Sequence, residues 1–324
     1  LIYSPTLSLT NSLAFHHLPD RDADFGKVRV WGTVGWIVVG IAIGQWLLHS
    51  HTPAEILLDG EVSNQADIAA SQFAGMADAF KLSGILGGLM GLFCFVLPAT
   101  PPAGGSGNNA TFEALGEIKR QPLLTLFLIA VPVSCIHQFY FVHTAGFLGK
   151  FQTGATDSIN RIFGVGGGGL MTIGQMSEIL VLGAIPLVAK KVSRKALLSV
   201  GLLAYGLRMA LFVYGEDLGT VAVLTGVALH GFCFGCFIFV AFMVVDEQTS
   251  DDVRASAQSL FNLVIIGIGI IAGSMIAGSV AEWATVDGVL DYTRLFSIPM
   301  WASLACLVLL QVAYPRRSPV IDPA

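Results

Sequence analysis

The sequence has little charge. Lys, Arg, Asp and Glu together make up 12% of its 324 residues, whereas a typical soluble domain carries about 25%. Hydrophobic residues make up 54%, and the mean hydropathy is +0.73. A buried core cannot absorb that much apolar surface in a chain of this length, but lipid can. The scarcity of charge therefore excludes an ordinary soluble domain and predicts an integral membrane protein in contact with the lipid bilayer.

The sequence also lacks the patterns of a metal site, a disulfide framework or a nucleic-acid surface. The net charge is −5, so the composition does not indicate a basic surface that would bind nucleic acid. Cys233 and Cys236 form a CxxC pair, but no second pair of metal ligands accompanies them. All five cysteines lie inside apolar runs and are typical of small buried side chains; they are Cys94, Cys135, Cys233, Cys236 and Cys306. We therefore predict neither a metal nor a cofactor.

Catalytic motifs are missing as well. The sequence contains no HExxH, no GxSxG and no paired acidic metal motif. Residues 164–169 (GVGGGG) formally match GxGxxG, but no strand precedes them and no acidic residue follows at the required distance. The sequence therefore predicts that the protein is not an enzyme.

Long apolar segments are abundant. A helix of roughly 20 apolar residues crosses a bilayer core of about 30 Å, and helices are favoured because lipid leaves no partner for an open sheet edge. Residues 1–18 are apolar enough to form a ninth span beside eight clearer ones. The eight are 28–49, 82–99, 122–148, 163–189, 196–215, 218–246, 256–282 and 293–314. We predict an all-α integral membrane bundle with about nine transmembrane helices.

The distribution of Lys and Arg predicts the orientation. With the C-terminus in the cytoplasm, twelve of the 17 basic residues lie on the cytoplasmic side and four on the outer side, and Arg208 lies within a span. This bias agrees with the positive-inside rule. We expect a multi-pass protein of the cytoplasmic (inner) membrane.

Two long loops divide the predicted helices. Residues 50–80 are predicted to form an acidic external loop, and residues 100–121, rich in Pro, Gly and Asn, a cytoplasmic linker. Residues 1–99 would then hold three helices, residues 122–316 a six-helix bundle and residues 317–324 a cytoplasmic tail. Six helices after the linker and three before it suggest that three helices are missing at the start.

Four motifs occur in one order along nearly the whole chain. They are YSPTLSLTNSLAF (3–15), VRVWGTVGW (28–36), the segment 174–212 beginning GQMSEILVLG, and RASAQSLF (254–261). Together they resemble the nucleoside:proton symporters of the major facilitator superfamily. The resemblance implies twelve helices in two six-helix halves, so that residues 1–99 would carry helices 4–6.

Gln175 and Glu178 lie in the middle of an apolar segment. Their i,i+3 spacing places both on one helix face, and an ionisable residue inside a membrane is costly and usually functional. Glu178 could form a structural ion pair, for instance with Arg208, or it could bind substrate together with Gln175. The resemblance implies the second role, in which the two residues hold ribose hydroxyls or a base edge.

Arg29, Thr33 and Trp36 share another helix face. A guanidinium, a hydroxyl and an indole on one face suit hydrogen bonding and stacking with a nucleoside. Alternatively, Arg29 extends its head group to the cytoplasmic surface. The resemblance implies that these residues bind substrate, and it implies the same for Gln138. Three residues after Gln138, where the family has a binding asparagine, this sequence has Phe141.

The segment LHGFCFGCFIF carries His230 and Phe234 on one face, where the family has a tyrosine and a phenylalanine. We expect both to contact substrate. Proton-coupled members of the family place an aspartate at the next position, which is Gly235 here. Glu178 and His230 are therefore the candidates for proton coupling, since histidine is suited to relaying protons.

The resulting prediction is a secondary active transporter that imports nucleosides, or a similar polar ring compound, by alternating access, with protons as candidate co-substrates. A sugar or polyol carrier and an uncoupled facilitator of the same superfamily are alternatives, because Phe141 and Gly235 depart from the family pattern. A non-transporting membrane sensor on a carrier scaffold is an alternative from another class.

Overall fold

The structure is a computed structural model that describes residues 21–58, 61–99, 110–151, 157–189, 191–250 and 253–315, together with Thr6, Thr10, 13–14 and 17–18. The predicted ninth span at 1–18, apart from these isolated positions, and the predicted tail at 317–324 lie outside the described residues.

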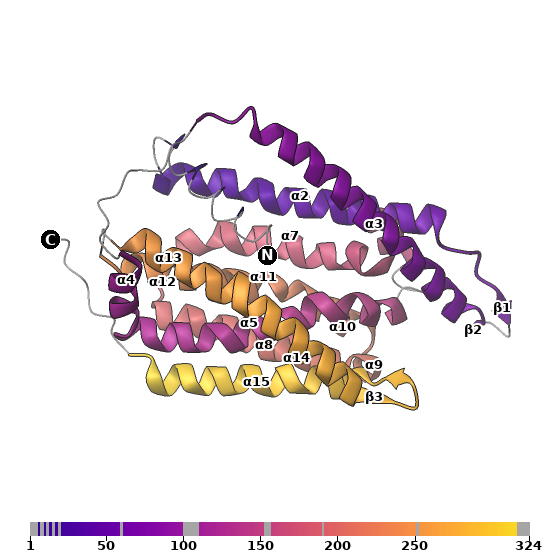
Figure 1. Ribbon diagram of the computed structural model, residues 1–324. Helices are drawn as coiled ribbons and strands as arrows, with labels where there is room; N and C mark the ends of the chain where they lie inside the picture. Colours follow the sequence, from indigo (N-terminus) through magenta and orange to yellow (C-terminus); the bar gives the residue numbers. More distant parts are fainter. Residues whose placement is uncertain are drawn as a thin grey trace. The chain divides into compact units, whose positions relative to one another are not determined.

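Helices account for nearly all of the described chain (Figure 1). The strands form two short antiparallel hairpins, in which Leu57 pairs with Val62 and Thr285 with Leu290. The elements are α2 (Arg21–Ser50), β1 (Leu57–Leu58), β2 (Glu61–Val62), α3 (Gln65–Cys94), α4 (Ala110–Ile118), α5 (Leu123–Leu148), η1 (Gly149–Phe151), α6 (Asp157–Phe163), α7 (Gly166–Val188), α8 (Arg194–Val213), α9 (Gly215–Leu218), α10 (Thr220–Ala228), α11 (His230–Phe232), the π-helix η3 (Cys233–Phe239), α12 (Val240–Glu247), α13 (Arg254–Asn262), the π-helix η4 (Leu263–Ile268), α14 (Gly269–Ala284), β3 (Thr285–Val286), β4 (Val289–Leu290) and α15 (Tyr292–Ala313).

Seven helical stretches of the described chain are long and apolar enough to cross a membrane. They correspond to seven of the eight predicted segments. The eighth, 163–189, forms α7, whose apolar part is the shorter stretch Gly169–Ile185. The all-α fold predicted from the sequence is confirmed.

The second predicted span was placed too late in the chain. The structure begins α3 at Gln65 and ends it at Cys94, whereas hydropathy placed the span at 82–99 and an external loop at 50–80. Residues 65–81 contain six Ala, the residue that most favours helix, but they carry too many polar side chains to be recognised by hydropathy. The loop is therefore confined to residues 51–64, which contain the β1–β2 hairpin.

The chain forms two compact units. Unit 1 comprises residues 1–30, 107–144 and 173–324, and unit 2 comprises residues 31–106 and 145–172. This grouping follows packing, whereas the predicted division at 100–121 follows the order of helices along the chain and stays a prediction.

In unit 1, α8 packs against α15, η3 and α10. The helix begins at Ser193, whose hydroxyl accepts a hydrogen bond from the Ala196 amide at 3.2 Å and so caps the N-terminus. Gly201 allows close approach to η3, because a Cβ there would lie 2.7 Å from Phe237 Cβ. Leu198, Leu202, Tyr205, Met209 and other side chains of α8 are buried. Helix α8 is therefore the centre of this unit.

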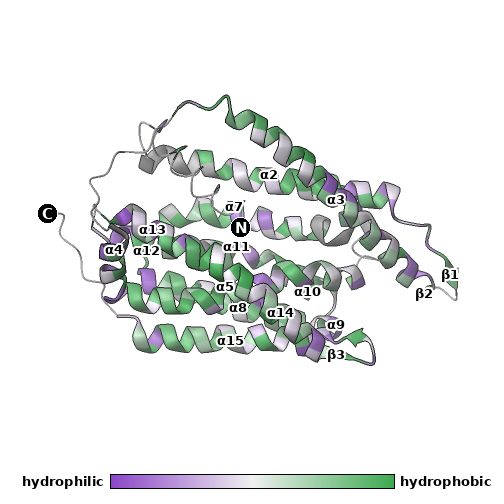
Figure 2. Ribbon diagram, viewed as in Figure 1, coloured by the Kyte–Doolittle hydropathy of each residue, from purple (hydrophilic) through white to green (hydrophobic). Residues whose placement is uncertain are grey.

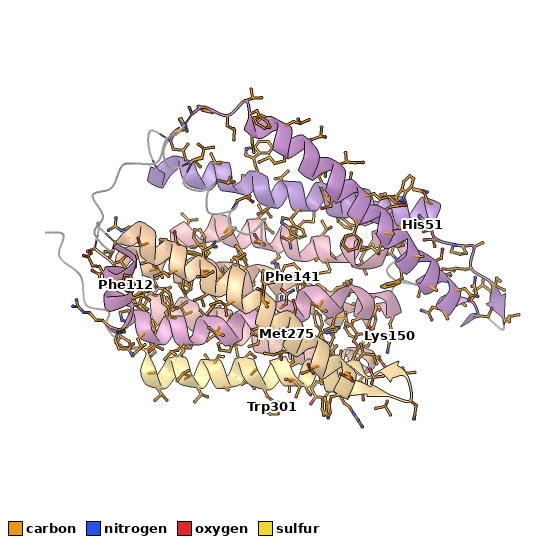
Figure 3. The ribbon with its side chains drawn as sticks, viewed as in Figure 1. His51, Phe112, Phe141, Lys150, Met275 and Trp301 are labelled. Atoms are coloured by element: carbon orange, nitrogen blue, oxygen red, sulfur yellow. The ribbon has the colours of Figure 1, made fainter. Side chains whose placement is uncertain are left out.

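The outer faces of these helices are apolar. Figure 2 shows hydrophobic residues along most of their length. Met275 on α14 is 69% exposed and Trp301 on α15 is 64% exposed, and Figure 3 shows Trp301 projecting from α15. Large exposed apolar surfaces mark contact sites for other molecules or for lipid. On helices long and apolar enough to cross a membrane, such surfaces are suited to face lipid.

In unit 2, α2 docks against the turn between α6 and α7. The Gly44 carbonyl accepts a hydrogen bond from the Val165 amide at 3.0 Å. The Gln45 side chain donates from Nε2 to the carbonyls of Arg161 and Ile162, at 2.8 and 3.0 Å. Gly44 is required for this approach, because a Cβ there would lie 2.5 Å from the backbone oxygen of Phe163.

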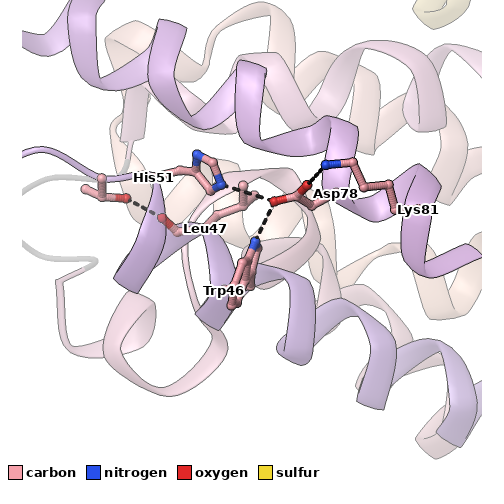
Figure 4. A network of polar contacts seen from close by, with 6 residues as sticks. Trp46, Leu47, His51, Asp78 and Lys81 are labelled. Atoms are coloured by element: carbon pink, nitrogen blue, oxygen red, sulfur yellow. Dashed lines mark hydrogen bonds and ion pairs between the residues drawn. The ribbon is translucent and has the colours of Figure 1, made fainter.

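A polar network joins α2 to α3 (Figure 4). Asp78 accepts a hydrogen bond from Trp46 Nε1 at 2.9 Å and pairs with Lys81 Nζ at 2.7 Å. His51 Nε2 lies 3.3 Å from the same carboxylate. The acidic residue that hydropathy alone would count against a span therefore has partners from both helices.

We expect Gly44→Ala to lower the melting temperature of the detergent-solubilised full-length gene product. The added methyl group meets backbone rather than a flexible side chain, and overpacking of this kind typically costs about 1–3 kcal/mol. The matched control is Gly35→Ala on the same helix, where no described heavy atom lies within 4 Å of the new Cβ. The control should melt at the parent temperature or slightly above it, since Ala favours helix over Gly. Equal melting temperatures for the two variants would contradict the docking of α2 at Gly44.

Candidate functional site

A buried polar cluster lies within unit 1, where α5, α7, α8 and α11 meet. Glu178 on α7, Arg208 on α8 and His230 on α11 have only 6%, 0% and 1% of their surfaces exposed. Most of the residues around them on these helices are apolar. Ionisable side chains in such a setting are costly and usually serve a function.

Two glycines bring α7 and α11 close enough to form the cluster. A Cβ at Gly174 would lie 3.0 Å from both His230 Cβ and Tyr140 Oη. A Cβ at Gly231 would overlap the backbone of Ser177. His230 also lies directly before the π-helix η3, and such widened turns are frequent at functional sites.

His230 connects the two charged side chains. Its Nδ1 lies 3.0 Å from Arg208 Nη1, and its Nε2 lies 3.5 Å from Glu178 Oε2. Gln175 Nε2 also lies 3.5 Å from His230 Nε2. An ion pair between Glu178 and Arg208 was one alternative from the sequence, and the structure links these two residues through the imidazole.

Aromatic rings surround the guanidinium and the imidazole. Tyr140 stacks on His230 with ring centroids 4.9 Å apart, and Arg208 Cζ lies 4.2 Å from the Tyr140 centroid. Tyr205 contributes a second ring, 5.2 Å from Arg208 Cζ. A cation over an aromatic face is stabilised by the ring quadrupole. Arg208 is therefore held by two tyrosines as well as by His230.

A second histidine extends the cluster. His137 stacks on His230 with ring centroids 5.3 Å apart, and its Nδ1 lies 2.7 Å from the Tyr205 hydroxyl. Phe141 meets both imidazoles edge-on. Sequence reasoning did not place His137, Tyr140 or Tyr205 in the site. For Tyr205, the i,i+3 spacing to Arg208 on α8 was a signal that the two side chains share a helix face.

The structure brings together three of the residues predicted from sequence: Gln175, Glu178 and His230. Gln138 is half-buried and lies against α14, because a Cβ added at Gly273 would lie 2.9 Å from the Cβ of Gln138. Phe234 is half-buried in η3.

The other three predicted residues lie on α2. Arg29 occupies a helical position, but its side chain is outside the described part of the chain. Thr33 is half-buried, and Trp36 is 65% exposed, both in unit 2. Their relation to the buried cluster of unit 1 stays a prediction.

Gly235 faces apolar side chains. A Cβ there would lie 2.7 Å from Val181 Cγ1 and 3.9 Å from Ile185 Cγ1. A carboxylate at this position would therefore meet hydrocarbon rather than the polar cluster. Among the described residues, no group of three His, Cys, Asp or Glu side chains is placed to hold a metal ion. The described side chains of the cluster offer hydrogen bonds and titratable groups.

Comparisons with known proteins identify the family of the chain. The sequence model of the family described as nucleoside H⁺ symporter matches residues 1–318. YegT of Escherichia coli K12, named provisionally as a nucleoside transporter, is 30% identical over 293 residues, which cover 87% of this chain and 61% of YegT. The nucleoside permease NupG of the same organism is 26% identical over 310 residues, which cover 91% of this chain and 67% of NupG.

A solved structure supports the fold. The crystal structure of a NupG variant, with one aspartate replaced by alanine, matches 96% of this chain and 74% of its own with a TM-score of 0.69 and 25% identity. The chain spans about three fifths of the length of YegT and two thirds of that of NupG. The family predicted from the four motifs is confirmed, and it is a family of transporters rather than enzymes. The chain belongs to the nucleoside H⁺ symporter family.

Proposed function

We propose that the protein imports nucleosides across the cytoplasmic membrane together with protons, as a multi-pass secondary transporter with a cytoplasmic C-terminus. The observation that carries the proposal is the buried cluster of Gln175, Glu178, His230 and Arg208 in an otherwise apolar bundle of this family. The excess of Lys and Arg in the predicted cytoplasmic loops supports the orientation.

Each proposed site residue suits part of a nucleoside. Gln175 and Glu178 lie on one face of α7 and offer an amide and a carboxylate for ribose hydroxyls or a base edge. Phe234 supplies an aromatic face for stacking, and Gln138 supplies a further amide. On α2, we propose that Arg29, Thr33 and Trp36 also bind substrate, and alternating access would expose the bound substrate to each side in turn.

Proton coupling would use Glu178 or His230. A coupled carrier needs a group that takes up a proton on one side and releases it on the other, and both residues lie in the buried cluster. A second candidate function is uncoupled facilitation, which Gly235 favours because it offers no titratable group. Phe141, which meets His230 edge-on, keeps a sugar or polyol carrier as another candidate, and a sensor on the carrier scaffold would bind substrate without moving it.

We expect cells that express the full-length gene product, and lack other nucleoside carriers, to accumulate labelled uridine. Unlabelled nucleosides should compete with it and sugars should not. Collapse of the proton gradient should reduce accumulation to equilibration. Competition by sugars alone would favour the polyol carrier, equilibration in the parent without accumulation would favour the facilitator, and binding without uptake would favour the sensor.

We expect Glu178→Gln to reduce nucleoside affinity or turnover strongly, because it removes the cluster's only described carboxylate but keeps its size and hydrogen-bonding capacity. The measurement is uptake by proteoliposomes containing the purified variant. Glu282→Gln, at an exposed position on α14, is the matched control and should behave like the parent. Parent-like transport by Glu178→Gln would show that this carboxylate is structural.

We expect Gln175→Ala to weaken binding less than Glu178→Gln does. A neutral hydrogen bond contributes about 0.5–1.5 kcal/mol, which corresponds to a roughly 2- to 13-fold loss of affinity. Equilibrium binding of a labelled nucleoside to the detergent-solubilised full-length variant measures the effect. An unchanged dissociation constant would remove Gln175 from the proposed binding site.

A further inference from the structure

The contact between Arg208 and His230 restricts the protonation state of the imidazole. An arginine side chain has only hydrogen-bond donors and stays protonated in proteins. Arg208 Nη1 lies 3.0 Å from His230 Nδ1, so Nδ1 has to be the acceptor. A neutral imidazole with an unprotonated Nδ1 carries its proton on Nε2. The contact therefore selects one tautomer.

The Nε2–H of this tautomer points to the opposite side of the cluster. It faces Glu178 Oε2 and the Gln175 amide, each at 3.5 Å from Nε2. These distances lie at the outer limit of hydrogen bonding, and the oxygen and nitrogen of a glutamine amide are interchangeable by a flip. Either acceptor can therefore take this hydrogen bond.

Burial and two aromatic rings hold the Arg208 side chain in place. Its guanidinium is completely buried, between the rings of Tyr140 and Tyr205. Within the described part of the chain, Nε and Nη2 have no hydrogen-bond acceptor. His230 Nδ1 is therefore the acceptor on which the buried cation depends, and an unpaired charge in such a place is costly.

The surroundings of His230 contain two charged groups. From α7 it is faced by Glu178 and Gln175, and from α8 by Arg208. From α5 it is faced by the rings of His137, Tyr140 and Phe141. An imidazolium would place an N–H against an N–H of Arg208 and two cations side by side, and it would remove the acceptor of Arg208. A proton on the Glu178 carboxylate leaves His230 Nδ1 free to accept the hydrogen bond of Arg208.

We infer that Arg208 is a positioning residue that keeps His230 neutral as the Nε2–H tautomer, so that the transported proton binds Glu178. The inference rests on the proposed function only in taking this proton to be the transported one. His230 then acts as a fixed hydrogen-bond donor to Glu178 or Gln175, and it is not the proton carrier. The sequence left Glu178 and His230 as equal candidates, and the geometry at Arg208 distinguishes them.

The protonation state of His230 can be measured directly. In the full-length protein labelled with ¹⁵N-histidine, with His230→Gln used to assign the signal, we expect the chemical shifts of a neutral Nε2–H imidazole from pH 5 to 8. In Arg208→Gln, which removes the cation, the same signal should titrate within this range. An imidazolium signal, or an Nδ1–H tautomer, in the parent would overturn the inference. If Arg208→Gln does not fold, the parent spectrum still decides.

Transport measurements test the second half of the inference. In proteoliposomes with an imposed pH gradient, His230→Gln should still accumulate nucleoside, at a reduced rate. Glu178→Gln should lose accumulation, and the exchange of internal for external nucleoside that remains should no longer respond to the pH gradient. Accumulation by Glu178→Gln, or its loss in His230→Gln with exchange intact, would overturn the inference. Absence of both binding and exchange in the parent would instead refute the proposed function, while the histidine spectrum would still test the role of Arg208.

Discussion

The cost of burying a permanent positive charge among apolar helices determines how the helices of unit 1 are arranged. Arg208 cannot release its proton, and its side chain has no exposed surface. The compensating groups come from three other elements: Tyr140 from α5, Glu178 from α7 and His230 from α11. A rotation of any of these helices would withdraw a partner from the cation. The polar cluster thus fixes the rotation of helices whose apolar surfaces would by themselves pack in several ways.

Small residues make this arrangement possible. The polar groups can reach one another only because the backbones of α7 and α11 approach closely at Gly174 and Gly231. Small residues serve the same purpose wherever membrane helices pack without the hydrophobic driving force that water provides. In unit 2 the same device appears at Gly44, where backbone meets backbone. The glycines therefore set the distance between helices, and the polar residues set their rotation.

The sequence predicted the family and the helical fold, and it singled out three residues that the structure brings together, for identifiable reasons. Hydropathy detects a span whose side chains face lipid, and Glu178 and His230 were recognisable because an ionisable residue contrasts with an apolar run. The start of α3 was missed because residues 65–81 are helical without being strongly apolar. Tyr140 and Tyr205 were missed because a buried aromatic residue looks the same in sequence whether it contacts a cation or an aliphatic neighbour. Only the rotation of α5 and α8 distinguishes these cases, and hydropathy does not define it.

The charge balance of the cluster gives a physical reason for the glycine at position 235. Arg208 contributes one positive charge and Glu178 one negative charge, and His230 connects them as a neutral group under the inference above. Among the described residues of the cluster, a second carboxylate would find no cation besides Arg208. At position 235 it would also face Val181 and Ile185, which offer no hydrogen bond. An aspartate there would require a different partner and a different packing of α7. The histidine at position 230 and the glycine at position 235 therefore fit the same charge balance. In this balance, Glu178 on α7 supplies the negative charge of the described cluster.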